Sequence, residues 1–161
     1  MTDDVGDPDR PLVVPDLWSV KYQYSYGRSS RFFRELKDNR RLMGTRCPKC
    51  GRVLCAPRAD CRTCYVPTEW VEVARTGTVL TYAVVHEAVS DYRGPTPYAV
   101  AQVNIDGTDS CILQIVRGIE PDKVRVGLRV QARFKAEREG RITDIECFEP
   151  APDAPGEQEA Q

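Results

Sequence analysis

The chain has 161 residues, which suffices for one domain of ordinary size, or a small domain with an appendage, and is too short for a two-domain enzyme with a large cleft. Hydrophobic residues make up 41% and charged residues 29%, a globular composition, and the net charge of −1 excludes a uniformly basic nucleic-acid binder. No apolar run has the length of a signal peptide or a membrane span. We therefore expect a cytoplasmic protein with no membrane partner.

Both ends of the chain lack a periodic apolar pattern. Residues 1–17, rich in proline and early aspartate, are expected to form a flexible arm. Residues 150–161 combine proline with acidic side chains and are expected to form a disordered acidic tail. Between these ends, residues 21–62 carry twelve bases and three acids. Such a segment suits phosphates or an acidic partner surface, and it also suits a solvated helix face.

Three tyrosines alternate with polar residues before the first predicted helix, at positions 22, 24 and 26. This pattern suits an edge strand or an arm laid on a partner, where tyrosine is favoured, and we favour the partner. Apolar residues at spacings of three, four, six and seven then predict a helix between Ser29 and Met43, ended by Gly44. Its apolar positions are Phe32, Phe33, Leu36, Leu42 and Met43, and its basic face holds Arg31, Arg34, Lys37, Arg40 and Arg41.

Two Cys-x-x-Cys pairs, separated by ten residues, give the strongest signal in the chain. Each pair can form a knuckle that points two sulfurs at one metal, and Gly51 suits the positive φ that such a turn needs. Four thiolates favour zinc in a closed structural site, whereas iron in the same site would make a rubredoxin-like electron carrier with visible absorption. The predicted ligands are Cys47, Cys50, Cys61 and Cys64.

The other candidate reactive residues have simpler interpretations. Cys111 and Cys147 fall in predicted strands and are expected in the core, while Cys55 belongs to the ribbon as a buried or spare thiol. His86 is the one histidine and has no serine or cysteine motif beside it. No phosphate loop, dinucleotide fingerprint or nucleophile elbow is present, so we expect no catalytic residues in this chain.

After the cysteine pairs the pattern changes to period two with β-branched runs, which predicts strands. Five or six short strands without a further helix favour a small closed barrel, because closure removes exposed edges. We therefore expect a helix and zinc ribbon in residues 18–67 and a barrel in residues 68–149. The predicted strands are Trp70 to Ala74, Thr78 to Ala88, Tyr98 to Ile105, Ser110 to Arg117, Leu128 to Ala136 and Arg141 to Phe148, with turns at Asp106–Asp109 and Glu139-Gly140.

A zinc ribbon joined to an OB-type barrel also occurs in nucleic-acid-binding modules, which makes this an alternative function. Such modules place basic and aromatic side chains together on the central barrel strands. The predicted strand from Thr78 offers Tyr82 and His86 without a Lys or Arg, and the strand from Tyr98 offers no base either. Nucleic acid is therefore the less favoured partner.

The order of these features resembles the zinc-ribbon/OB-fold family known as a domain of unknown function, which accompanies thiolases and thiolase-like acyl-CoA enzymes. The likeness covers residues 30–148 and departs from the usual pattern at Tyr65, where glycine commonly follows the second knuckle. The segments that carry it are Phe32-Phe33 with Leu36, Cys47-Pro48-Lys49-Cys50-Gly51, Ala56-Pro57-Arg58, Trp70-Val71-Glu72-Val73, Gly77 to His86, Pro97 to Val103 and Val126-Gly127-Leu128-Arg129-Val130.

This resemblance implies a mainly β protein, in which an N-terminal helix and a rubredoxin-like zinc ribbon precede a five- to six-stranded OB-fold-like barrel. It implies a non-catalytic subunit of a thiolase or retro-aldolase complex, as in aromatic or steroid degradation. Zinc is then structural, a CoA ester binds only through the complex, and the partner supplies the nucleophile. Residues expected to meet the partner or CoA are Arg31, Arg34, Lys37, Arg40, Arg41, Arg52, Arg58 and Arg62.

Overall fold

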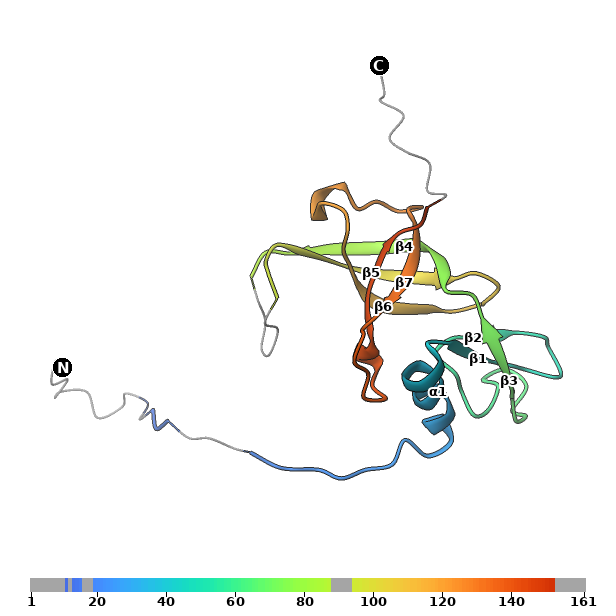
Figure 1. Cartoon of the computed structure of the whole chain (residues 1–161). Helices are drawn as coiled ribbons and strands as arrows, with labels where there is room; N and C mark the ends of the chain where they lie inside the picture. The colour runs from blue at the N-terminus through green and yellow to red at the C-terminus, as the bar shows by residue number, and fades with distance from the viewer. Residues whose placement is uncertain (1–10, 12, 16–18, 88–93, 153–161) are drawn as a thin grey trace, which may run out of the picture.

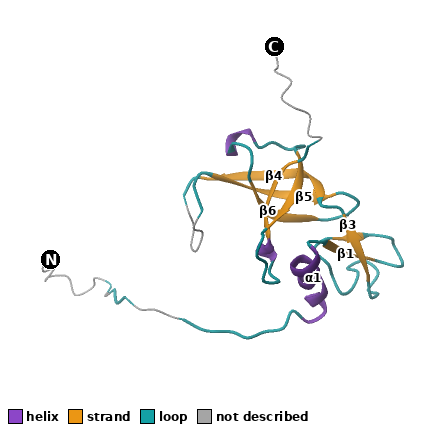
Figure 2. Cartoon of the chain, in the orientation of Figure 1, coloured by secondary structure: helices purple, strands orange, loops and turns teal. Residues whose placement is uncertain are grey.

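The computed structural model describes residues 11, 13–15, 19–87 and 94–152. Most of the predicted flexible arm and most of the predicted acidic tail lie outside these residues. Figure 1 shows an extended N-terminal segment that leads into a short helix, a small sheet beside that helix and a barrel next to both, and Figure 2 shows that strands predominate. No helix in the described ranges has the length and apolar character needed to cross a membrane.

The helical segment is shorter than predicted. It consists of a 3-10 turn (Gly27–Ser29), helix α1 (Ser30–Arg34) and a π-helical turn (Glu35–Asn39). Arg40 then adopts the left-handed conformation with a φ of 53°, which reverses the chain. The prediction of a helix extending to Met43 is therefore wrong, because the segment ends at Arg40 and not at Gly44.

A small antiparallel sheet with the order β2-β1-β3 follows the helix. Its strands are β1 (Leu42–Arg46), β2 (Val53–Leu54) and β3 (Glu69–Val73). Leu42 and Met43 begin the central strand and are both buried, so their apolar run belongs to a strand covered on both faces. At Gly44, a Cβ atom would lie 2.9 Å from both the Leu54 carbonyl oxygen and Val73 Cγ1. Gly44 therefore permits close approach of the strands and does not end a helix.

The larger sheet is a closed barrel with the strand order β4-β5-β6-β8-β7. Its strands are β4 (Thr76–Val85), β5 (Tyr98–Ile105), β6 (Cys111–Val116), β7 (Arg129–Phe134) and β8 (Ile145–Pro150). Neighbouring strands are antiparallel except β6 and β8, which pair in parallel. The predicted mainly β fold with a closed barrel is confirmed, and the turn at Asp106–Asp109 joins β5 to β6 as expected.

The last predicted strand, Arg141 to Phe148, begins too early. A 3-10 turn at Ile142–Asp144 precedes β8, because the loop folds around the buried carboxylate of Asp144. The backbone amides of residues 139–141 donate to this carboxylate at 3.0, 2.7 and 3.2 Å. Burial alone would raise the pKa of Asp144, but these three donors hold the pKa below its ordinary value.

One hydrophobic core joins the helix, the small sheet and the barrel. Phe32, Leu36 and Leu42 belong to the same cluster of buried side chains as Val79 and Phe148 of the barrel. The loop between β7 and β8 also reaches the helical segment, where Arg138 Nε donates to the carbonyl oxygen of Lys37 at 2.6 Å. The two sheets are therefore packed as a unit, with the cysteine knuckles at one end of it.

Candidate metal centre and basic hollow

The first cysteine knuckle follows β1 directly. The Cys47 amide donates to the carbonyl of Arg52, and the Gly51 amide donates to the carbonyl of Cys47, both at 2.9 Å. These two bonds close a tight turn that carries Cys47 and Cys50 on one side. Gly51 has a φ of 75°, so the positive φ expected from the sequence is confirmed at this position.

The second knuckle repeats this hydrogen-bond pattern. The Cys61 amide donates to the carbonyl of Val66, and the Tyr65 amide donates to the carbonyl of Cys61, again at 2.9 Å. Tyr65 takes the place of the glycine and adopts a φ of 54°. Its side chain is 86% exposed, so it extends into solvent without obstructing the turn. The departure from glycine therefore leaves the geometry of the second knuckle intact.

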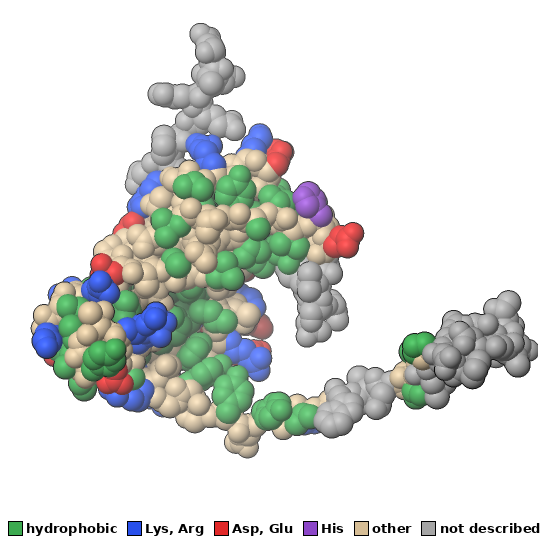
Figure 3. Space-filling model, turned by 180° about the vertical axis from the view of Figure 1, so that it is seen from behind, with side chains coloured by type: hydrophobic (Ala, Val, Ile, Leu, Met, Phe, Trp, Pro, Cys, Tyr) green, Lys and Arg blue, Asp and Glu red, His purple; other side chains and the backbone are tan. Residues whose placement is uncertain are grey.

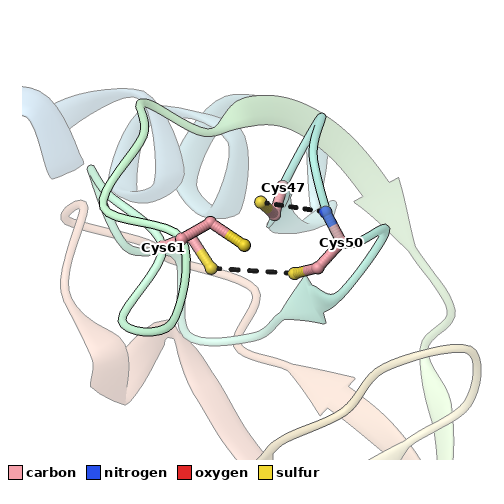
Figure 4. Close-up of side chains that lie close together, drawn as sticks. Cys47, Cys50 and Cys61 are labelled. Carbon is pink, nitrogen blue, oxygen red and sulfur yellow. Dashed lines mark hydrogen bonds between the residues drawn. The ribbon is translucent and has the colours of Figure 1, made fainter.

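The two knuckles bring four sulfurs together. The Sγ atoms of Cys47, Cys50, Cys61 and Cys64 all lie within 4.8 Å of one another. Figure 4 shows three of these residues, in which the sulfurs of Cys50 and Cys61 are 3.7 Å apart. A tetrahedral zinc with Zn–S bonds of about 2.3 Å requires sulfur separations of roughly 3.8 Å. The cluster thus has the size and the donor set of a structural zinc site.

Backbone amides around the cluster favour thiolate sulfur. The Cys50 amide donates to Cys47 Sγ at 3.5 Å, and the amides of Cys64 and Thr63 lower the pKa of Cys61 to about 6. Burial, together with the neighbouring thiols, raises the pKa of Cys64 to about 12. Four thiolates cannot crowd together without a cation, so this arrangement fits a divalent metal that neutralises part of their charge.

The remaining cysteines lie away from the cluster. Cys55 is fully buried, and burial raises the pKa of its thiol to about 12, as expected of an inert core residue. Cys147 is also fully buried in β8, which agrees with the prediction. Cys111 is half-buried instead, and its sulfur lies 3.7 Å from Gln102 Oε1. The core placement predicted for Cys111 is therefore wrong, since the residue pairs with Asn104 of β5, where side chains point outward.

Three of the predicted basic residues line one concavity beside the second knuckle. We call it the basic hollow; its volume is about 420 Å³. Arg52 Nη1 donates to Thr63 Oγ1 across it at 3.3 Å. The lining residues are Arg52, Leu54, Arg58, Cys61, Arg62, Thr63, Asp109 and Ser110. Sequence reasoning missed the last two, because the β5–β6 turn carries no signal of its contact with the ribbon.

The other predicted basic residues do not join the basic hollow. The guanidinium of Arg31 lies 5.6 Å from the ring centroid of Trp70, and Arg41 forms an exposed ion pair of 3.5 Å with Glu72. Arg34, Lys37 and Arg40 are exposed, and the left-handed Arg40 marks the end of the helical segment. A single basic helix face is therefore not formed, because positions 40 and 41 lie beyond the helix.

Comparison with known proteins agrees with this architecture. Two family profiles match, one described as the rubredoxin-like zinc ribbon domain of ChsH2 over residues 34–69 and one as the C-terminal OB-fold domain of ChsH2 over residues 70–135. A DUF35 domain-containing scaffold protein of Methanocaldococcus jannaschii is 33% identical over 122 residues, which cover 74% of this chain and 86% of that protein. The chain belongs to the DUF35 family. The zinc-ribbon/OB-fold resemblance noted in the sequence is thereby confirmed.

Two further matches have descriptions that name enzymes. A solved structure described as Ltp2-ChsH2(DUF35) aldolase contains a chain that is 28% identical, with a TM-score of 0.60 over 80% of this chain and 98% of that one. A probable enoyl-CoA hydratase alpha subunit of Thermomonospora curvata is 33% identical over 105 residues. That match covers 64% of this chain and 32% of the longer relative.

Proposed function

We propose that this DUF35 chain is a non-catalytic accessory subunit of a thiolase-type acyl-CoA enzyme complex. The partner is a thiolase or a thiolase-like retro-aldolase, and the two chains form a hetero-oligomer. The DUF35 chain completes the acyl-CoA binding region or stabilises the complex, and a CoA ester meets it only there. The catalytic groups belong to the partner.

The observation that carries this proposal is the match to nearly the whole of a chain in the Ltp2-ChsH2(DUF35) aldolase, of which 98% is covered. That description joins a DUF35 part to a second component in one enzyme. The M. jannaschii relative is described as a scaffold protein and the T. curvata relative as a subunit of an enoyl-CoA enzyme. All three descriptions support a role within an assembly, and the enoyl-CoA hydratase name supports a partner that acts on an acyl-CoA.

The proposed metal is one structural zinc held by Cys47, Cys50, Cys61 and Cys64. Four thiolate ligands leave no open coordination position, so this zinc would organise the ribbon and would not polarise a substrate. The zinc would also fix the basic hollow, because Cys61 lines it. The two family profiles meet between residues 69 and 70, which supports a ribbon unit over 18–67 and a barrel unit over 68–149.

The chemistry of the described residues also supports a non-catalytic role. His86 is exposed just beyond the end of β4. Across the described ranges, no hydrogen bond joins it to a serine, cysteine or carboxylate that would make a catalytic pair. A serine or cysteine nucleophile activated by this histidine would need such a contact, and we propose that the reacting groups belong to the partner.

The basic residues are proposed to contact the partner or the CoA phosphates. Arg52, Arg58 and Arg62 converge on the basic hollow, so we place the principal contact there. A guanidinium can bind a phosphate or a carboxylate through two parallel hydrogen bonds, which suits either ligand. The further predicted contact residues, spread over the helical segment, are Arg31, Arg34, Lys37, Arg40 and Arg41.

The proposal is tested by affinity capture of the tagged full chain from its own cells, followed by reconstitution with the purified captured protein. We expect a thiolase-fold protein in a defined stoichiometry, no acyl-CoA turnover by the DUF35 chain alone, and partner activity that depends on the chain. The proposal fails if no acyl-CoA enzyme accompanies the chain. It also fails if the chain instead binds single-stranded nucleic acid with steep salt dependence.

A further inference from the structure

The eight residues before the helical segment have the sequence pattern of a half-buried β-strand. Polar and apolar side chains alternate strictly through residues 19–26, so an extended backbone would place them on opposite faces. Valine and tyrosine, which the apolar face carries, are residues favoured in strands. The apolar positions are Val20, Tyr22, Tyr24 and Tyr26, and the polar positions are Ser19, Lys21, Gln23 and Ser25.

This segment pairs with no strand in the part of the chain that the structure describes. Val20 is 58% exposed, Tyr22 is 80% exposed and Tyr24 is 72% exposed. Among the described residues, no backbone hydrogen bond joins residues 19–25 to the remainder of the chain. Figures 1 and 3 show the segment running away from the ribbon and the barrel. An apolar strand face and the unpaired amides of its backbone therefore both lie open to another chain.

The root of the segment is fixed to the folded body. The ring of Tyr26 stacks on Phe33 with centroids 3.8 Å apart and an interplanar angle of 24°, and Tyr24 packs edge-on against Tyr26 at 5.5 Å. The Ser29 amide donates to the Tyr26 carbonyl at 3.0 Å, which closes the turn into the helical segment. This anchor gives the strand a defined starting point and direction, which lowers the entropy cost of docking it on a partner.

We propose that residues 19–25, which precede the helical backbone of Tyr26, add as an edge strand to a β-sheet of the partner subunit. Main-chain hydrogen bonds to an unpaired strand of the partner provide affinity, and pockets for Val20, Tyr22 and Tyr24 on one face provide specificity. Tyrosine suits this role because it buries a large ring at low entropy cost while its hydroxyl reaches a polar atom at the rim. The inference rests on the proposed function, since it assigns the accessory subunit a specific contact with its enzyme.

The test compares two double variants of the full chain for binding to the purified captured partner. Tyr22→Ser with Tyr24→Ser removes the large side chains of the apolar face, and Ser19→Ala with Gln23→Ala alters only the polar face. We expect the first variant to raise the Kd by about tenfold or more, and the second by less than about twofold. Both variants lie outside the core, so thermal melting of the isolated chain should match that of the wild type.

Hydrogen exchange tests the backbone pairing separately. Amides of residues 19–25 should exchange rapidly in the free chain and at least about tenfold more slowly in the complex, as in a paired strand. An unchanged Kd for the tyrosine variant, or unprotected amides in a stable complex, would overturn the edge-strand assignment while leaving the accessory function standing. A dimer of this chain alone that the same tyrosines hold together would likewise overturn it. If the wild-type chain binds no thiolase-fold protein, the proposed function itself fails.

Discussion

Ser110 and Cys55 exchange two hydrogen bonds across the junction between the barrel and the ribbon. The Cys55 amide donates to Ser110 Oγ at 2.8 Å, and the same hydroxyl donates to the Cys55 carbonyl at 2.7 Å. Beside them, the Val53 amide donates to the Asp109 carboxylate at 2.9 Å. The Asp109 amide in turn donates to the Val53 carbonyl at 2.7 Å. The β5–β6 turn thus continues the hydrogen bonding of the ribbon sheet beyond β2.

The first prediction concerns this junction. Ser110→Ala removes the hydroxyl that serves both polar groups of Cys55, and the part-buried amide then has no other partner among the described residues. We expect a loss of about 1–3 kcal/mol in the free energy of unfolding, because a buried donor left unsatisfied costs its desolvation energy. Urea unfolding of the zinc-loaded protein measures the change.

Thr81→Val is the matched control for the loss of a hydroxyl. Thr81 is exposed on β4, and valine keeps the β-branched shape that strands favour. We expect its unfolding free energy to stay within about 0.5 kcal/mol of the wild type. Equal stability of the Ser110 and Thr81 variants would show that the junction contributes nothing.

The barrel and the cysteine cluster could be predicted from the sequence because each depends on a local pattern. The apolar residues Ala101, Val103 and Ile105 recur at every second position, as a strand with one buried face requires, and the glycine at position 107 marks a tight turn between strands. The two Cys-x-x-Cys pairs each form their knuckle within a few residues, so their geometry needs little from elsewhere in the fold.

The errors arose where local pattern and tertiary contact disagree. Leu42 and Met43 stand at helical spacing from Leu36, but a short apolar run looks the same in a buried central strand. Arg40 ends the helical segment in a left-handed conformation. Glycine commonly marks such a position in a sequence, whereas an arginine does not. The contacts of Ser110 with the ribbon join residues 55 positions apart, which no periodicity reveals.

The second prediction concerns the identity of the metal and its ligands. Cys61→Ala removes one of four thiolates, and zinc content measured by mass spectrometry should fall from one ion per chain to well below that. Cys55→Ala removes a buried thiol of the same ribbon outside the cluster and should keep full zinc at a cost of about 1 kcal/mol in stability. Full zinc in the Cys61 variant, or iron with visible absorption in the wild type, would contradict the assignment.

The third prediction follows from the shared core. Zinc in small ribbons contributes roughly 10 to 16 kcal/mol of apparent binding energy, which is comparable to the whole stability of a domain. Chelation should therefore unfold the ribbon, and the barrel should then lose its packing against Phe32, Leu36 and Leu42. We expect calorimetry to show the barrel melting at least about 5 °C lower, with recovery on adding zinc back. An unchanged barrel transition would mean that the two units are energetically independent.

The fourth prediction concerns acid stability. Arg129 donates to both carboxylate oxygens of Asp106 at 2.7 and 2.6 Å, and this contact, aided by Thr76, lowers the pKa of Asp106 to about 2. A lowered folded-state pKa stabilises the fold above the unfolded pKa of about 4, and that contribution disappears as the pH falls from about 4 to 2. Because both side chains are more than one-third exposed, we expect about 1 kcal/mol at most.

Asp106→Asn measures this contribution directly. Urea unfolding should show the variant less stable than the wild type at pH 7, and this difference should shrink to well under half at pH 2.5, where the carboxylate is largely protonated in the unfolded chain but not in the folded one. Asp122→Asn, in the exposed 3-10 turn Pro121–Lys123, provides the control and should follow the wild type at both pH values. If the difference in unfolding free energy between Asp106→Asn and the wild type were the same at both pH values, the ion pair would be excluded as its cause.

The last prediction tests the basic hollow in the reconstituted complex. Arg58→Glu and Arg62→Glu reverse charges on side chains that are exposed in the isolated chain, so the fold should tolerate both. A desolvated contact to a carboxylate or phosphate contributes about 1.5–3 kcal/mol, so reversing the arginine's charge should raise the Kd or the KM about tenfold or more. Reversing a solvated arginine would change neither constant measurably. A raised Kd for the partner locates the contact on its surface, whereas an unchanged Kd with a raised KM for the CoA ester locates it at the phosphates.

The choice of control decides whether this experiment can be interpreted. Arg138 is unsuitable because its guanidinium donates to the carbonyls of Lys37, Lys135 and Ala136, so its reversal would disturb the packing of the helical segment. Arg125 is exposed outside the basic hollow, and Arg125→Glu changes the net charge by the same amount. We expect Arg125→Glu to leave both the Kd and the KM within about twofold of the wild type, since long-range steering alone is screened at physiological salt. If all three charge reversals had equal effects, the change in Kd or KM would come from net charge, and the basic hollow would not be part of the interface.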